Sequence, residues 1–190
     1  MNTTSLCFFI GICLVAICPV SNGARRSRYL LQWNKYDFVK HWDAISSMTI
    51  FIEKNGLISS ELVLTQPLDE VWLKTSIIVP RPVQQTKMLL MESEFEICQF
   101  LREGNMKNKI GLYVFQNMVK NSNFPKQCPI SKGLLYFHNI DGLDQFPAFL
   151  PESNFTIRMR FHRPNTTDSV NVTLDGTVIE KNNARYKIWV

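Results

Sequence analysis

The sequence has little cysteine: five residues in 190, and three of them, Cys7, Cys13 and Cys18, lie before residue 24. Only Cys98 and Cys128 remain in the rest of the chain. None of the three histidines, His41, His138 and His162, is spaced with another histidine, a cysteine or a carboxylate as a tetrahedral zinc site requires. The sequence therefore predicts no metal site.

The sequence also lacks an apolar run long enough to cross a bilayer. Its longest run covers residues 6–17, about twelve residues, whereas a span of the hydrocarbon core needs about twenty. The run is typical of the h-region of a secretory signal peptide, with Ser21 and Gly23 as small residues before a cut near Ala24. A buried N-terminal helix is the alternative, but no amphipathic pattern supports it. We expect residues 1–23 to be a signal peptide and residues 24–190 to form a single secreted, extracellular domain.

Removal of the signal peptide leaves two cysteines in an oxidising compartment, where such a pair most often forms a disulfide. Cys98 and Cys128 are 30 positions apart, and two separate thiols are the alternative. The net charge of +5 lies wholly in the secreted part, because residues 1–23 carry no charged side chain. For a secreted protein we expect no nucleic-acid partner. Binding to anionic lipid head groups, binding to acidic glycans and simple solubility remain as explanations of the positive charge.

Motifs that carry catalytic chemistry are absent as well. The sequence has no G-x-S-x-G elbow, no H-E-x-x-H helix and no phosphate-binding glycine loop. Its histidines, His41, His138 and His162, are isolated from one another in sequence. We therefore expect no enzyme and no cofactor, with a triad assembled by the fold from one of these histidines, a serine and a carboxylate as the alternative.

What the sequence does have is alternation. Residues 154–162 place Phe155, Ile157, Met159 and Phe161 on one face and polar residues on the other, the pattern of a strand with one buried side. Residues 169–176 repeat the pattern, and Asp175-Gly176 resembles a hairpin turn. Further strands are expected at residues 47–53, 57–65, 70–80, 86–92, 134–140 and 184–190, with Asn55-Gly56 as a turn.

Helical spacing occurs in one region only. Residues 94–104 and 108–121 both carry apolar residues at helical intervals, and Gly104 is a plausible C-cap. The expected fold is mainly β: a two-sheet sandwich of about eight strands with a short two-helix insertion. Cys98 lies in the first helix and Cys128 follows the second, so the disulfide would tie the insertion to the sheet.

Surface chemistry can be predicted from the same alternation. Three N-glycosylation sequons begin at Asn154, Asn165 and Asn171, and those in strands lie on the polar face. Arg158 and Arg160 share that polar face, which indicates a solvated surface or, alternatively, a patch that attracts anionic head groups. The abundant aromatic residues are compatible with a filled core or with a ligand cavity.

One ordered set of features resembles a known family. It comprises Cys98 in EICQFLREGN, a second apolar helix, the block NFPKQCP at residues 123–129, a strand near Gly133 and Leu150-Pro151 before the next strand. The pattern is similar to an insect family of uncharacterised secreted proteins allied to the CheB chemosensory proteins. That family in turn resembles the ML lipid-recognition superfamily, which includes the ganglioside activator.

The resemblance implies an immunoglobulin-like β-sandwich with an apolar pocket between its sheets. The ligand would be a fatty acyl chain, a sterol or a pheromone-like lipid, and a membrane surface or receptor would be a further partner. By polarity and position, the candidate lining residues are Trp72, Phe95, Phe100, Phe115 and Phe155. The leading hypothesis is a secreted carrier of a hydrophobic molecule, with a chemosensory role implied by the resemblance; the alternative is a protein–protein interaction module with a filled core.

Overall fold

The structure is a computed structural model that describes residues 29–54, 56–81, 86–104, 109–140 and 152–180. The expected signal peptide, Leu150-Pro151 and the expected strand at residues 184–190 lie outside these described residues.

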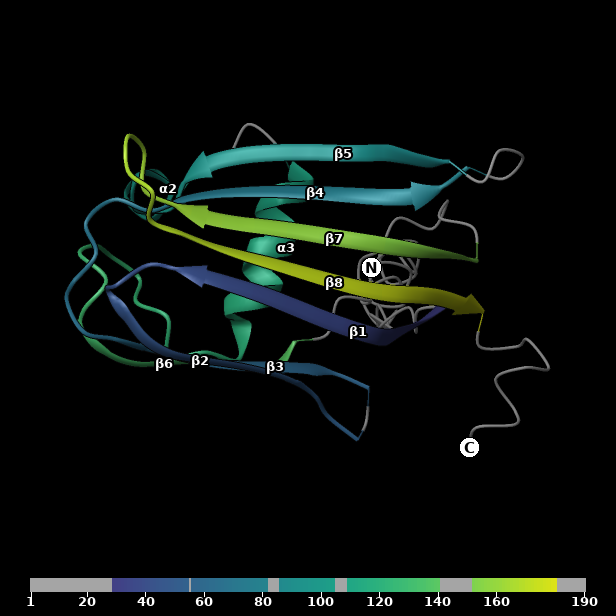
Figure 1. Cartoon of the computed structure of the whole chain (residues 1–190), viewed down its shortest axis with the longest axis horizontal. Helices are drawn as coiled ribbons and strands as arrows, with labels where there is room; N and C mark the ends of the chain where they lie inside the picture. Colours follow the sequence, from purple (N-terminus) through teal and green to yellow (C-terminus); the bar gives the residue numbers. More distant parts are fainter. Residues whose placement is uncertain (1–28, 55, 82–85, 105–108, 141–151, 181–190) are drawn as a thin grey trace, which may run out of the picture.

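The described residues form eight strands in two antiparallel sheets, which confirms the predicted β-sandwich with a two-helix insertion (Figure 1). One sheet has five strands in the order β1-β8-β7-β4-β5, and the other has three in the order β2-β3-β6. The strands are β1 (Tyr29–His41), β2 (Ile45–Ile52), β3 (Ile58–Leu64), β4 (Trp72–Pro80), β5 (Lys87–Glu96), β6 (Gly133–Ile140), β7 (Ser153–His162) and β8 (Ser169–Glu180).

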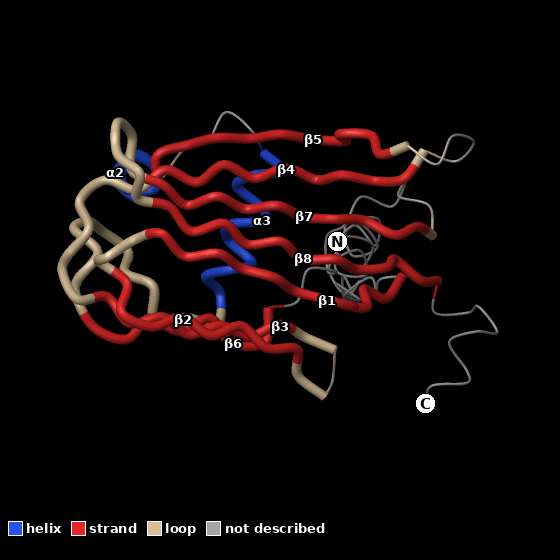
Figure 2. Tube along the Cα trace, in the orientation of Figure 1, coloured by secondary structure: helices blue, strands red, loops and turns tan. Residues whose placement is uncertain are grey.

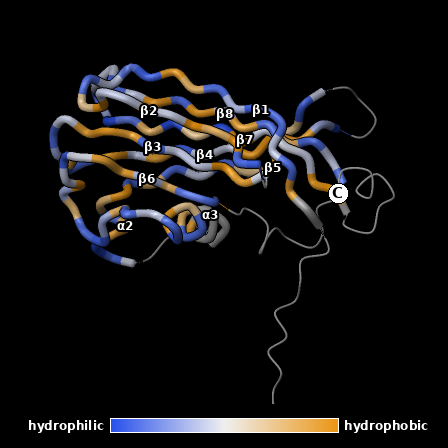
Figure 3. The backbone as a smooth tube through the Cα atoms, turned by 90° about the horizontal axis from the view of Figure 1, so that it is seen from below, coloured by the Kyte–Doolittle hydropathy of each residue, from blue (hydrophilic) through white to orange (hydrophobic). Residues whose placement is uncertain are grey.

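The predicted faces of β7 and β8 are confirmed. Phe155 and Ile157 are buried while Arg158 and Arg160 are exposed, and Val172 is buried in β8. This arrangement follows from the period of two, which turns alternate side chains toward opposite faces of a sheet. Hydrophobic and hydrophilic positions accordingly alternate along the strands in Figure 3.

Two features differ from the prediction. Strand β1 was not expected, although it pairs with β8 along most of its length. The Asp175-Gly176 pair is not a turn, because β8 continues through it and pairs with β1 and β7. Gly176 is needed there for a different reason: it lies against the ring of Phe155 on the neighbouring strand.

The insertion consists of α2 (Ile97–Glu103) and α3 (Lys109–Lys120). Helix α2 begins later than predicted, since β5 runs on to Glu96, whose carboxylate then caps the helix by accepting from the backbone N–H of Cys98 at 2.8 Å. It ends as predicted at Gly104, which has the left-handed conformation of a C-cap.

The insertion closes one side of the sandwich. Helix α2 adjoins β5, the edge of the larger sheet, and α3 packs against β6, the edge of the smaller sheet. In Figure 2, α3 crosses from the level of one sheet to the level of the other. On the opposite side a short turn joins β1, the edge of the larger sheet, to β2, the edge of the smaller sheet.

Candidate functional site

A cavity of about 110 Å³ lies between the two sheets. Strands β2, β3 and β6 form one wall, β7 and β8 form the other, and α2 and α3 contribute from the side. Among the described residues, its lining consists of hydrophobic residues and a single serine: Trp42, Ile45, Met48, Ile50, Ile58, Ser60, Leu62, Leu64, Leu68, Val71, Ile97, Phe115, Met118, Phe124, Ile130, Leu135, Phe137, Ile140, Met159, Phe161, Val170, Val172 and Leu174. No charged side chain is among these residues.

Trp42 is the most polar of the large lining side chains. It is 3% exposed, and its indole Nε1 is buried without a hydrogen-bond partner among the described residues. The guanidinium of Arg163 lies 5.8 Å from the centre of the Trp42 ring and is paired with Asp168 at 3.5 Å. Arg163 is not a lining residue, so its charge is kept outside the cavity.

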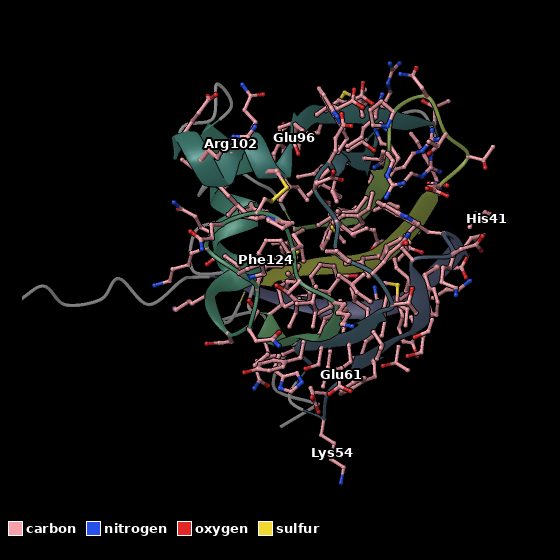
Figure 4. All side chains as sticks on the ribbon, turned by 90° about the vertical axis from the view of Figure 1, so that its left-hand side faces the viewer. His41, Lys54, Glu61, Glu96, Arg102 and Phe124 are labelled. Carbon is pink, nitrogen blue, oxygen red and sulfur yellow. A yellow bond between two sulfur atoms is a disulfide. The ribbon has the colours of Figure 1, made fainter. Side chains whose placement is uncertain are left out.

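A chain of aromatic contacts joins the two sheets beside the cavity. It starts at Phe95 on β5, passes through Phe100 and Phe115 on the helices and Phe124 after them, and ends at Phe137 on β6. Successive ring centroids along this chain are 5.1–6.0 Å apart, the separation of favourable aromatic pairs. Figure 4 shows Phe124 between the helical insertion and the sheets.

The disulfide fixes the insertion at this aromatic chain. Cys98 and Cys128 are bonded, with their Cα atoms 5.5 Å apart, which confirms the predicted pair (Figure 4). Two residues beyond Cys128, Ile130 exchanges backbone hydrogen bonds with Leu68 at 2.7 and 2.9 Å. Both residues line the cavity. The disulfide therefore joins α2 to the segment that supplies one end of the cavity wall.

The five candidates from the sequence occupy different places. Phe115 lines the cavity, and Phe95 and Phe100 contact Phe115 from behind without being lining residues. Phe155 lies outside the lining, edge-on to Trp33 at 5.6 Å. Trp72 also lies outside it, stacked on His162. The structure thus gathers the three phenylalanines at one side of the sandwich and leaves the other two aromatics apart from them.

Several lining residues were not candidates in the sequence analysis. Met118 could have been found, because it lies on the apolar stripe of the second helix. Trp42, Leu68, Phe124 and Ile130 lie in connecting segments, where no period marks a buried position. Only the folded chain brings them to the cavity.

The histidines lie away from the cavity. His138 on β6 pairs with Glu61 on β3 at 3.1 Å, and His162 on β7 pairs with Glu94 at 3.0 Å. The first pair joins neighbouring strands, whereas the second spans β4, which lies between β7 and β5. Both pairs lie on a face opposite the lining residues, while His41 is exposed at the end of β1. Within the described ranges, no three His, Cys, Asp or Glu side chains form a group that could hold a metal ion.

The sequon asparagines all lie on the outside of the sandwich. Asn154 is exposed at the start of β7, where its side chain accepts a hydrogen bond from Thr177 Oγ1 at 2.9 Å. Asn165 is exposed in the turn between β7 and β8, and Asn171 is half-buried on the outer face of β8. Among the helices of the described residues, none is long and apolar enough to cross a membrane.

Comparisons with known proteins show similarity to one family. A model described as "Protein of unknown function (DUF1091)" matches residues 73–157, which include both helices and both disulfide cysteines. No curated protein matches the sequence. Among solved structures, the fold is similar to chicken MD-1 complexed with lipid IVa, at 12% identity and a TM-score of 0.33, over 80% of this chain and 98% of that one. Because the family description names no activity, the cavity itself is the basis for a function.

Proposed function

We propose that this protein is a secreted binder of a hydrophobic small molecule, which it holds in the cavity between its two sheets. One observation carries the proposal: hydrophobic residues from both sheets and both helices converge on one space between the sheets, and no described charged side chain lines it. Transfer of a hydrocarbon from water into such a space is favourable by about 25 cal/mol per Å² of buried apolar surface. Few polar groups are needed to orient an apolar ligand.

The size of the cavity bears on the class of ligand. Its volume of about 110 Å³ is below the roughly 300–1,000 Å³ of a pocket for a drug-sized ligand. A slender acyl or hydrocarbon chain therefore fits the proposal better than a rigid sterol, and it widens the cavity on entering. Met48, Met118 and Met159 are in the lining, and methionine side chains repack readily around irregular shapes.

The architecture allows such widening at moderate cost. Among the described strands, no hydrogen-bonded pairing joins one sheet to the other, so the sheets contact each other through side chains. A small separation of the sheets keeps every ladder intact. The disulfide and the aromatic chain connect the two sheets at the helical insertion. We therefore expect the sheets to stay in place at the insertion and to separate on the opposite side.

The proposal also includes that the protein is secreted and that it binds its ligand without catalysing a reaction. A disulfide is typical of an oxidising compartment, which supports secretion. Both histidine–carboxylate pairs lie on outer faces, away from the space where a ligand would be held. The resemblance to CheB-allied proteins leads us to include a pheromone-like chain and a chemosensory role among the expected ligands and functions.

Glycosylation at Asn154, Asn165 and Asn171 completes the proposal. Each sequon is on the outside of the sandwich, where a glycan does not meet the cavity. Enzymatic deglycosylation of the secreted protein should lower its mass, and Asn→Gln changes at the three positions should each remove one increment. A secreted chain whose mass does not change on deglycosylation would contradict this part.

The test of binding is titration of the secreted protein with a fluorescent fatty acid, together with extraction of any lipid that copurifies. Val172→Phe adds volume on the cavity wall, and Arg158→Phe adds the same side chain on the exposed outer face of the neighbouring strand β7. We expect Val172→Phe to weaken binding by about tenfold or more, equivalent to ~1.4 kcal/mol, and Arg158→Phe to leave it unchanged.

Tryptophan fluorescence locates the bound chain. Trp42 lines the cavity, whereas Trp72 lies on the outer face. A ligand-dependent change in emission should be lost in Trp42→Phe and kept in Trp72→Phe. A protein that purifies without lipid and takes up no acyl, sterol or hydrocarbon probe would overturn the proposal in favour of an interaction module.

A further inference from the structure

Strand β5 lies at the edge of the larger sheet, where no other described strand pairs with its outer side, and it carries exposed apolar side chains. Met88, Leu89 and Leu90 are 37%, 55% and 43% exposed, three consecutive members of a strand at the edge of the larger sheet. In the part of the chain that the structure describes, β5 pairs with β4 alone. A free edge with exposed apolar residues is a template for pairing with another strand.

The sequence of this edge is complementary to itself. The β5 edge segment, Lys87–Glu92, reads Lys-Met-Leu-Leu-Met-Glu, with four apolar residues between one positive and one negative side chain. If two such segments run antiparallel about an axis between Leu89 and Leu90, Lys87 of each copy stands opposite Glu92 of the other. Opposite charges at directly facing positions stabilise a strand pair, and like charges destabilise it.

The faces of the residues agree with this register. Lys87 is opposite Pro80 and Glu92 is opposite Ser76 on β4, so both belong to the outer face of the sheet. Met88 and Met91 are opposite Val79 and Ile77 and therefore share the inner face. Directly facing residues of an antiparallel pair lie on the same face, as this register requires. The β-bulge between the two halves of the segment falls at the centre, so the charged pairs flank it on both sides.

We propose that β5 pairs with β5 of a second copy of this chain and forms a two-fold dimer with one continuous sheet. Such an interface is isologous, so each contact occurs twice. No β5 residue is among those that line the cavity. The dimer is therefore independent of the ligand and of the proposed function.

The test is a charge swap read by sedimentation equilibrium over a concentration series of the secreted protein. Lys87→Glu puts Glu opposite Glu at both positions, and Glu92→Lys puts Lys opposite Lys. Each single variant should weaken dimerisation by about tenfold or more, which corresponds to ~1.4 kcal/mol. An equimolar mixture of the two should form a heterodimer, because every Glu then faces a Lys, and Lys87→Glu/Glu92→Lys should dimerise by itself.

Apolar contacts are tested by a matched pair. Leu89→Lys places a charge in the middle of the β5 edge segment and should give a monomer, whereas Leu134→Lys changes an equally exposed leucine on β6 and should leave the dimer intact. Circular dichroism checks that each variant is folded. A wild-type chain that stays monomeric throughout the series, or charge variants that are not rescued by mixing, would overturn the proposal.

Discussion

Gly176 on β8 lies directly against the ring of Phe155 on β7. A Cβ at position 176 would come within 2.5 Å of Phe155 Cζ and 2.9 Å of its Cε1. Phe155 in turn meets Trp33 on β1 edge-on, with ring centroids 5.6 Å apart. The glycine thus makes room for an aromatic pair that spans three strands of the larger sheet, and this explains why Asp-Gly occurs inside a strand rather than in a turn.

Gly176→Ala should destabilise the protein by about 1–3 kcal/mol, the usual cost of forcing an extra carbon into a packed core. Urea unfolding of the secreted chain measures the change. Thr173→Ser, on the outer face of the same strand, keeps the Asn171 sequon, is the control and should cost far less. In a Phe155→Leu background the loss caused by Gly176→Ala should shrink, because the ring that it meets is gone. Equal losses in both backgrounds would contradict the contact.

Glu96 should stabilise the helical insertion by capping α2. Its carboxylate accepts from the backbone N–H groups of Cys98 and Gln99 at the start of α2. Glu96→Ala leaves these donors unpaired and should cost about 1–2 kcal/mol. Glu103→Ala, at the exposed end of the same helix, is the matched control. Thermal unfolding that shifts equally for the two variants would show that the cap does not stabilise α2.

Alternation in the sequence predicted β7 and β8 well, since each turns a clean apolar face inward. Strand β1 was not predicted, because Tyr36 and Val39 are exposed apolar residues and a bulge between Trp33 and Lys35 interrupts its pairing. The cavity was predictable only in part. Phe115 lies on a helical stripe, but residues from connecting segments reach the lining through long-range contacts such as the Leu68–Ile130 pair, which has no local signal.

The ion pair between Lys74 and Glu92 links β4 to β5 and should make stability depend on alkaline pH. The hydrogen bond from Lys74 Nζ to Glu92, 3.0 Å long, together with the attraction of the carboxylate, raises the pKa of Lys74 above its ordinary value of 10.5. A pKa that is raised on folding gives a contribution that is complete below the unfolded-state pKa and is lost as pH rises through the folded-state pKa.

Glu92→Gln removes the partner and should therefore lower stability near pH 8 but have a smaller effect at a pH above the raised folded-state pKa of Lys74, where the lysine is neutral. Urea midpoints of both proteins at the two pH values give this difference directly. The comparison is made at a concentration where both are monomeric, so that the β5 edge segment does not contribute. If the stability difference between the wild-type protein and Glu92→Gln is the same at both pH values, the Lys74–Glu92 ion pair is not its cause.

The disulfide should contribute more to stability than any other single feature of the insertion. It closes a loop across a sequence separation of 30 residues, for which chain entropy predicts about 3–4 kcal/mol. Cys98→Ala/Cys128→Ala should lower the free energy of unfolding by that amount in guanidinium titrations. Alanine replaces Cys98 because this side chain is fully buried, where a serine hydroxyl without a hydrogen bond would be costly, and alanine at the partly buried Cys128 matches it. A reductant should lower the free energy of unfolding of the wild-type protein to near that of the variant, and it should leave the free energy of unfolding of the variant unchanged. Removal of the disulfide can also be tested for its effect on uptake of a fluorescent fatty acid. If Cys98→Ala/Cys128→Ala weakens this uptake and Glu103→Ala does not, the disulfide that anchors the insertion contributes to ligand binding as well as to stability.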